Sequence, residues 1–97
     1  LEGAVATNEP PTPALLAELA QAERAAGDRD AAIATMERAL KLDASYATGH
    51  YLLGNLLAGA KRYKQAREHF EKYLKLEPKG PQADQARERL AQLDKLK

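Results

Sequence analysis

The fold is decided by residues 47–78, which read ATGHYLLGNLLAGAKRYKQAREHFEKYLKLEP. Apolar residues recur three and four positions apart along this stretch, a spacing that places them on one face of a helix. The pattern predicts one helix from about Ala47 to Gly59 and a second from about Tyr63 to Leu76. Because the link between them is so short, the two helices must fold back on each other as a hairpin.

The same pattern occurs once before, since residues 13–46 align with residues 47–80 over 34 positions each. Aligned small residues would let helix backbones approach closely, and aligned large residues would fill the space on either side. The chain is therefore predicted to contain two copies of one helical hairpin. The small pairs are Ala20 with Gly54 and Ala32 with Ala66, and the large pairs are Leu19 with Leu53 and Met36 with Phe70.

Capping residues indicate where the helices of the first hairpin begin and end. Thr12 precedes a proline, which is the preferred order for an N-cap and a first helical position. Gly27 is expected to end the first helix, and Asp28 or Asp30 can cap the second. Ser45 is the corresponding candidate N-cap for the third helix.

Residues 81–97 are predicted to form a fifth helix, from Gln82 to about Leu96. Pro78 and Gly80 end the helix before it. Its apolar residues fall on one face, and the rest of its surface is polar or charged. Such a helix suits the end of a stack, because each hairpin leaves an apolar face for its neighbour.

The composition favours an all-α fold with one modest core. The apolar residues of this 97-residue chain are mainly Ala and Leu, which favour helix, and β-branched residues are scarce. Residues 1–12 are rich in proline without any period, so we expect a flexible lead-in or linker. No apolar run is long enough to span a bilayer and no targeting segment is recognisable, which leaves the compartment, cytoplasmic or periplasmic, open. Because the chain opens at Leu1 without Met, we expect a piece of a longer protein. Our leading interpretation places it in a larger bacterial protein.

The second hairpin resembles the tetratricopeptide repeat, a helical hairpin with a period of 34 residues. The residues that carry the resemblance are His50-x2-Leu53-Gly54-x2-Leu57, Ala66-x3-Phe70 and Pro78. The resemblance implies a right-handed α-α superhelix, or solenoid, of about five antiparallel helices. Its parts would be repeats at 13–46 and 47–80 and a C-terminal capping helix at 81–97. The chain departs from the family pattern at Glu23, where a bulky residue is usual, and at Lys61 in the turn of the second hairpin, which is therefore expected to be distorted.

The resemblance also implies a concave groove, lined by the first helix of each hairpin, that receives extended peptides or partner helices. Among the groove positions, the predicted partner-binding residues are Gln21, Arg24, Tyr51, Asn55 and Arg89, with Tyr51 as the expected anchor. Amides and guanidinium groups suit backbone or carboxylate groups of a ligand. The other groove positions are Ala14, Ala17, Thr48, Ala58, Gln82, Gln85 and Gln92.

One subtype of the family is not expected. Members that clamp the C-terminal carboxylate of heat-shock chaperones use Lys, Arg and Asn side chains at fixed positions. The corresponding residues here are Ala17, Gln21, Leu52, Gln82 and Ala86, which supply no cation for such a clamp.

No catalytic, metal or cofactor site is predicted. With no Cys and two His, the chain offers too few ligands for zinc and no evident acid-base pair. His50 stands where the family usually has Trp, so it is expected to pack between repeats. His69 is expected to be ordinary surface.

Nucleic-acid binding is not expected, although basic residues gather in the second hairpin. Three Glu residues are interleaved with the lysines and arginines between Lys61 and Lys79, and Glu68 with Lys72 makes a favourable helical pair. Residues 1–46 have four basic and eight acidic side chains, a net charge of −4. Residues 47–97 have eleven basic and six acidic side chains, a net charge of +5, so the chain is electrically polar from end to end.

These observations predict a non-catalytic protein-interaction module that binds a peptide segment or helix of a partner protein in its groove. An alternative is a self-assembly element, because opposite charges at the two ends favour contact between copies and two repeats are few for a stable array. A spacer or accessory segment of an enzyme is a third reading.

Overall fold

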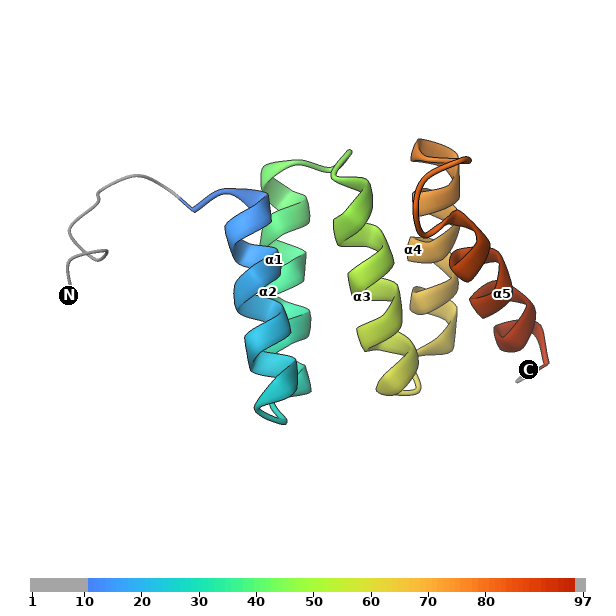
Figure 1. Cartoon of the computed structure of the whole chain (residues 1–97). Helices are drawn as coiled ribbons and strands as arrows, with labels where there is room; N and C mark the ends of the chain where they lie inside the picture. The colour runs from blue at the N-terminus through green and yellow to red at the C-terminus, as the bar shows by residue number, and fades with distance from the viewer. Residues whose placement is uncertain (1–10, 96–97) are drawn as a thin grey trace, which may run out of the picture.

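The computed structural model describes residues 11–95, which form five helices and no strand. The helices pack in chain order as a staggered row, each antiparallel to the one before it, and α1 overlaps α2 in the view of Figure 1. None of the five is long and apolar enough to cross a membrane. The predicted helical solenoid is confirmed, whereas the lead-in up to residue 10 and the predicted end of the last helix at Leu96 lie outside the described residues. The helices are α1 (Pro13–Ala25), α2 (Arg29–Leu42), α3 (Ala47–Gly59), α4 (Tyr63–Leu76) and α5 (Ala83–Asp94).

The helices of the first hairpin begin at the predicted caps. The backbone N–H of Leu15 donates to the Thr12 hydroxyl over 3.1 Å, and that of Ala31 donates to the Asp28 carboxylate over 3.1 Å. Each bond satisfies a backbone donor that the first turn of a helix leaves without a partner.

The predicted cap of the third helix is wrong. Tyr46 is the residue that precedes α3, and it makes no side-chain capping bond. The Ser45 hydroxyl instead donates to the Asp43 carboxylate over 2.7 Å, and the Ser45 backbone N–H donates to the same oxygen over 3.0 Å. These two bonds hold the pKa of Asp43 below its usual value. Ser45 therefore hydrogen-bonds to Asp43, two residues earlier, in a local turn, and it does not cap α3.

The turns inside the two hairpins are equivalent, so the expected distortion of the second turn is absent. Gly27 has φ +90° and Lys61 has φ +64°, and the two residues occupy the same place in the 34-residue alignment. The left-handed backbone that glycine adopts freely is thus imposed on a lysine in the second hairpin.

Close packing inside each hairpin follows the predicted pairing of small and large residues. Ala32, Met36, Ala66 and Phe70 are completely buried. A methyl group added at Gly54 would lie only 2.9 Å from the Phe70 ring, which shows how closely α3 approaches α4.

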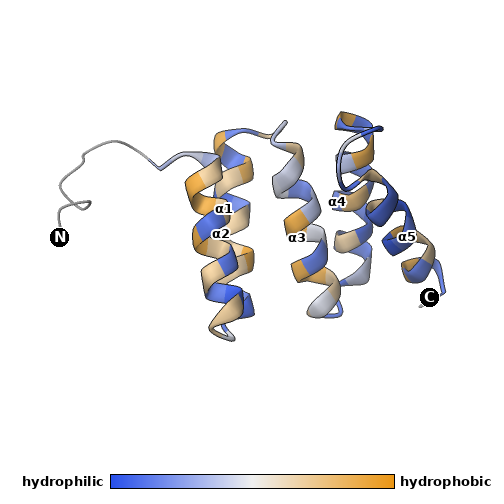
Figure 2. Ribbon diagram, viewed as in Figure 1, coloured by the Kyte–Doolittle hydropathy of each residue, from blue (hydrophilic) through white to orange (hydrophobic). Residues whose placement is uncertain are grey.

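Leu19 does not fill the core as predicted. It is 45% exposed, and Leu15 on the same helix is 56% exposed, whereas the aligned Leu53 is 1% exposed. The reason is position in the row, because α2 packs before α3 and no helix in residues 11–95 precedes α1. Figure 2 shows hydrophobic bands on α1, in contrast to the mostly hydrophilic α5 at the other end.

The polar residue Glu23, which departs from the family pattern, has a partner in the fold. Its carboxylate accepts the hydroxyl of Thr35 over 2.7 Å, and Thr35 is buried on α2. A hydrogen bond between α1 and α2 thus takes the place of the bulky side chain.

Specific contacts hold α5 against α4. The hydroxyl of Tyr73, which is 1% exposed, donates to the Gln82 side chain over 3.1 Å and accepts the Gln82 backbone N–H over 3.0 Å. Arg67 of α4 forms an ion pair with Asp94 at the end of α5. Helix α5 is therefore anchored at both of its ends.

Candidate functional site

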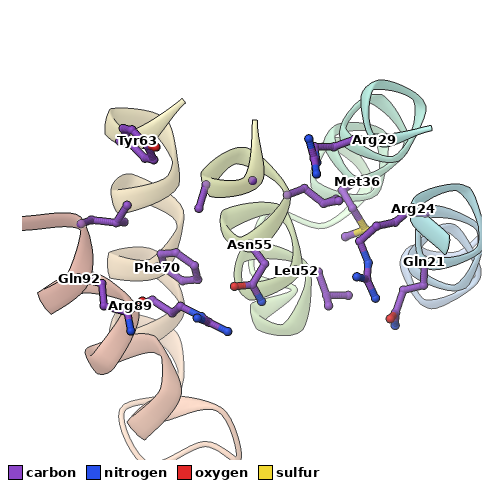
Figure 3. Close-up of a pocket in the computed structure, with 15 residues that line it drawn as sticks. Gln21, Arg24, Arg29, Met36, Leu52, Asn55, Tyr63, Phe70, Arg89 and Gln92 are labelled. Atoms are coloured by element: carbon purple, nitrogen blue, oxygen red, sulfur yellow. The ribbon is translucent and has the colours of Figure 1, made fainter. Parts of the chain in front are cut away.

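One face of the stack is hollowed into a cleft of about 680 Å³. Side chains of α1, α3 and α5 surround it, and the buried Met36 and Phe70 of α2 and α4 also line it (Figure 3). A hollow of this volume is within the range that proteins use to hold ligands.

Four of the five predicted partner-binding residues line this cleft: Gln21, Arg24, Asn55 and Arg89. They converge from three helices that are separate in the sequence, and in Figure 3 the Arg89 side chain extends from α5 towards Asn55.

Tyr51, the expected anchor, is not among the residues that line the cleft. Its half-buried ring meets Phe70 edge-on at 5.9 Å between centroids and Tyr73 at 5.7 Å. Packing thus accounts for the tyrosine ring, and its role as an anchor for a partner stays a prediction.

The other groove positions divide in the same way. Ala58 and Gln92 line the cleft, whereas Ala17 is buried in the core. The four that neither line the cleft nor lie in the core are Ala14, Thr48, Gln82 and Gln85.

Among the cleft residues that were not predicted as groove positions, Leu52 and Arg29 bear most directly on binding. Leu52 precedes Asn55 by three positions on α3, and this spacing puts both on one helix face, so the sequence held a signal for it. Arg29 begins α2 and reaches the cleft across the end of α3, where its guanidinium nitrogen would lie 3.1 Å from a methyl group at Gly59. Because this contact joins two hairpins, the spacing of residues within one helix could not reveal it.

The cleft has a one-sided charge. Arg24, Arg29 and Arg89 line it, and no Asp or Glu does. Within residues 11–95 none of these three side chains forms an ion pair or a side-chain hydrogen bond. Gln21, Asn55 and Gln92 add amide groups, which can both donate and accept hydrogen bonds.

The two histidines form a pair away from this cleft. His50 is 3% exposed, which confirms its predicted packing role, and its Nδ1 lies 3.0 Å from Nδ1 of His69. The Nε2 atom of His50 lies 2.8 Å from the carbonyl oxygen of Ala44. Because a carbonyl only accepts, His50 donates from Nε2 and accepts the Nδ1 proton of His69 at its own Nδ1.

His69 is therefore not ordinary surface, and that prediction is wrong. Its half-buried ring stacks on His50 with 5.2 Å between centroids. Burial, followed by the nearby charges of His50 and Lys72, lowers the pKa of His69 to about 4, and Glu68 opposes this only in part. The spacing of apolar residues along α4 did not reveal that α3 would bring His50 against His69.

The histidine pair does not amount to a metal centre. Within the described part of the chain, no group of three or more His, Asp or Glu side chains is arranged to hold a metal ion. The cleft is thus the site whose shape and polar lining point to a ligand.

Comparison with known families supports the repeated helical hairpin. A family model for the tetratricopeptide repeat matches residues 17–84, well over half of the chain. The matched region runs from within α1 to the start of α5, so it covers most of the first hairpin and all of the second. A search of curated proteins finds no match.

Proposed function

The chain belongs to the tetratricopeptide repeat family, and from that premise we propose that it binds a peptide segment of a partner protein in the cleft between α1, α3 and α5. Repeats of this family generally mediate protein-protein interaction and are typically non-catalytic. The observation that carries the proposal is the convergence of Gln21, Arg24, Asn55 and Arg89 on one hollow.

Amide and guanidinium groups at such a place match the needs of a peptide. An extended segment carries backbone N–H and C=O groups that lose water on binding, and each must find a partner. Gln21 and Asn55 can supply both donors and acceptors to them, and Leu52, on the same helix as Asn55, offers an apolar contact. Members of the family receive peptides on their helical hairpins, and the amide, guanidinium and apolar side chains of this cleft suit that use.

Selection from a random-peptide library tests the proposal. We expect peptides selected by the wild-type protein to lose about tenfold in affinity for the double variant Gln21→Ala with Asn55→Ala, since two amide contacts are removed. The matched control is Thr48→Ala with Gln85→Ala, which removes polar side chains at groove positions outside the cleft. Unchanged affinity for the first variant would place the binding site elsewhere.

A second candidate function is self-assembly, which the exposed leucines of α1 favour. Leu15 and Leu19 present an apolar strip at the end of the row that the cap does not cover. The net charges of the two halves, −4 and +5, add an attraction between copies that salt would screen. Sedimentation at low and high salt, with Leu15→Gln and Leu19→Gln as a paired variant, tests this. A monomer at high protein concentration and low salt would remove the candidate.

A further inference from the structure

The arginines of the cleft lack the carboxylates that usually accompany exposed arginine. Arg24 comes from the last turn of α1 and Arg89 from the middle of α5, so two helices that are distant in sequence bring like charges to one hollow. Within residues 11–95 neither of the two has an acidic partner, and no acidic residue lines the cleft. Cations placed together without compensation attract an anionic group of a ligand.

Arg29 has a different setting from the other two. Its guanidinium lies against Gly59, the last residue of α3, so it already takes part in a contact between the two hairpins. Arg24 and Arg89 are the two that remain available to a ligand.

An apolar contact lies between these two arginines. Figure 3 shows Leu52 and Asn55 of α3 between Arg24 on one side and Arg89 on the other. Leu52 is half-buried, so part of its side chain faces the hollow. A bound segment would thus meet positive charge, an aliphatic surface and positive charge again.

We propose that the cleft selects an acidic peptide segment in which side-chain carboxylates flank an aliphatic residue. The carboxylates bind Arg24 and Arg89, the aliphatic side chain contacts Leu52, and the amides of Gln21 and Asn55 bind the peptide backbone. Arginine suits this task because its planar guanidinium can hold a carboxylate with two parallel hydrogen bonds. This inference rests on the proposed function and adds the chemical class of the ligand.

The side chains that line the cleft favour a peptide over a nucleic acid as its ligand. Single-stranded nucleic acids bind grooves in which successive bases stack on exposed aromatic rings. Phe70 is completely buried, and the ring of Tyr51 packs on Phe70 and Tyr73, which leaves the half-buried Tyr63 as the accessible ring in the cleft. The basic residues of α4 are interleaved with Glu68 and Glu71 and do not extend the charge of the cleft.

Fluorescein-labelled peptides with blocked termini test the inference by anisotropy. The acidic probe contains the core Asp-Glu-Leu-Asp-Glu, and the matched neutral probe contains Asn-Gln-Leu-Asn-Gln. At about 50 mM salt we expect the acidic probe to bind about tenfold more tightly than the neutral one, and the difference to shrink at about 500 mM salt. The double variant Arg24→Gln with Arg89→Gln should abolish the preference. The control Arg38→Gln with Lys41→Gln removes the same charge from exposed positions outside the cleft and should retain it.

Backbone amide shifts on probe addition separate the failures. Equal affinity of both peptides with shifts at cleft residues would overturn the acidic preference and leave peptide binding in the cleft intact. Shifts from every peptide outside the cleft, or none at all, would overturn both proposals. Tighter, cleft-dependent binding of a labelled oligothymidylate than of the acidic peptide would overturn the inference in favour of nucleic acid.

Discussion

Replacement of Gly54 by alanine tests the contact that sets the distance between α3 and α4. The new methyl carbon would lie 2.9 Å from one carbon of the Phe70 ring and 3.0 Å from two others. Non-bonded carbons prefer about 3.5 to 4.0 Å, so the ring must retreat by roughly half an ångström or more. Phe70 is completely buried and meets Tyr51 edge-on, which leaves it little room to do so.

Two opposing terms decide the net effect of Gly54→Ala. Overpacking of a core costs about 1 to 3 kcal/mol. Alanine in place of glycine inside a helix offsets about 0.5 to 1 kcal/mol of this. We therefore expect the free energy of unfolding to fall by about 1 kcal/mol and the melting temperature by about 4 to 8 °C, measured by circular dichroism.

A second background isolates the clash between the two residues. In Phe70→Leu, which removes the ring, Gly54→Ala should become neutral or stabilising, with a coupling energy of about 1 to 3 kcal/mol. The exposed Ala34→Gly in the middle of α2 measures the helix-propensity term in the same protein. If Gly54→Ala raised the stability equally in both backgrounds, close approach to Phe70 would not be the reason for glycine here.

Three further predictions concern the turn, the cap and the histidine pair. Lys61→Gly should raise the melting temperature, by relief of about 1 kcal/mol of left-handed strain. Tyr73→Phe leaves the Gln82 backbone N–H without its partner, so we expect a loss of about 1 to 3 kcal/mol, seen in denaturant unfolding and in faster hydrogen exchange across α5. Because the pKa of His69 falls from 6.5 to about 4 on folding, the unfolded chain takes up the proton first as pH drops. Stability should therefore be complete above about pH 6.5 and decline by about 1 kcal/mol towards pH 4, an amount already reduced for the half-exposed ring, and a His69→Gln variant should lack this decline in pH-dependent melting.

Local signals in the sequence were sufficient for most of the helical architecture. Caps at Thr12 and Asp28 and the glycine at position 27 act within a few residues, so they can be recognised without knowledge of the fold. The prediction that Ser45 caps the third helix was wrong because its hydroxyl binds Asp43 instead. Both hydrogen-bonding patterns are local, so the sequence favours neither of them over the other.

The errors in burial have a different origin, which is position in the stack. Leu19 and Leu53 occupy the same place in the 34-residue alignment, yet only Leu53 has a helix before it. A repeating pattern describes each unit as though it had neighbours on both sides and is silent about ends. His69 was misjudged for a related reason, since its surroundings come from another helix.

The candidate cleft could be predicted in outline but not in full. The alignment with family positions brought forward Gln21, Asn55 and Arg89, all of which line the hollow. It could not show that Tyr51 would turn its ring to Phe70, because that depends on side-chain packing. The contribution of Arg29 needed the distance between two hairpins, which no single helix encodes.

The two ends of the stack differ in their packing, and this difference affects which hairpin should unfold first. In a linear array, the free energy needed to open one hairpin is its own stability plus that of each interface it shares. The pair α3 and α4 shares interfaces with α2 and with the anchored α5, whereas α1 and α2 share an interface on one side within residues 11–95. Partial opening should therefore start at the N-terminal hairpin, where amide protons would exchange at a lower free energy than in α4. Within residues 11–95 we therefore expect stability to rise along the axis of the stack, with its highest value next to α5.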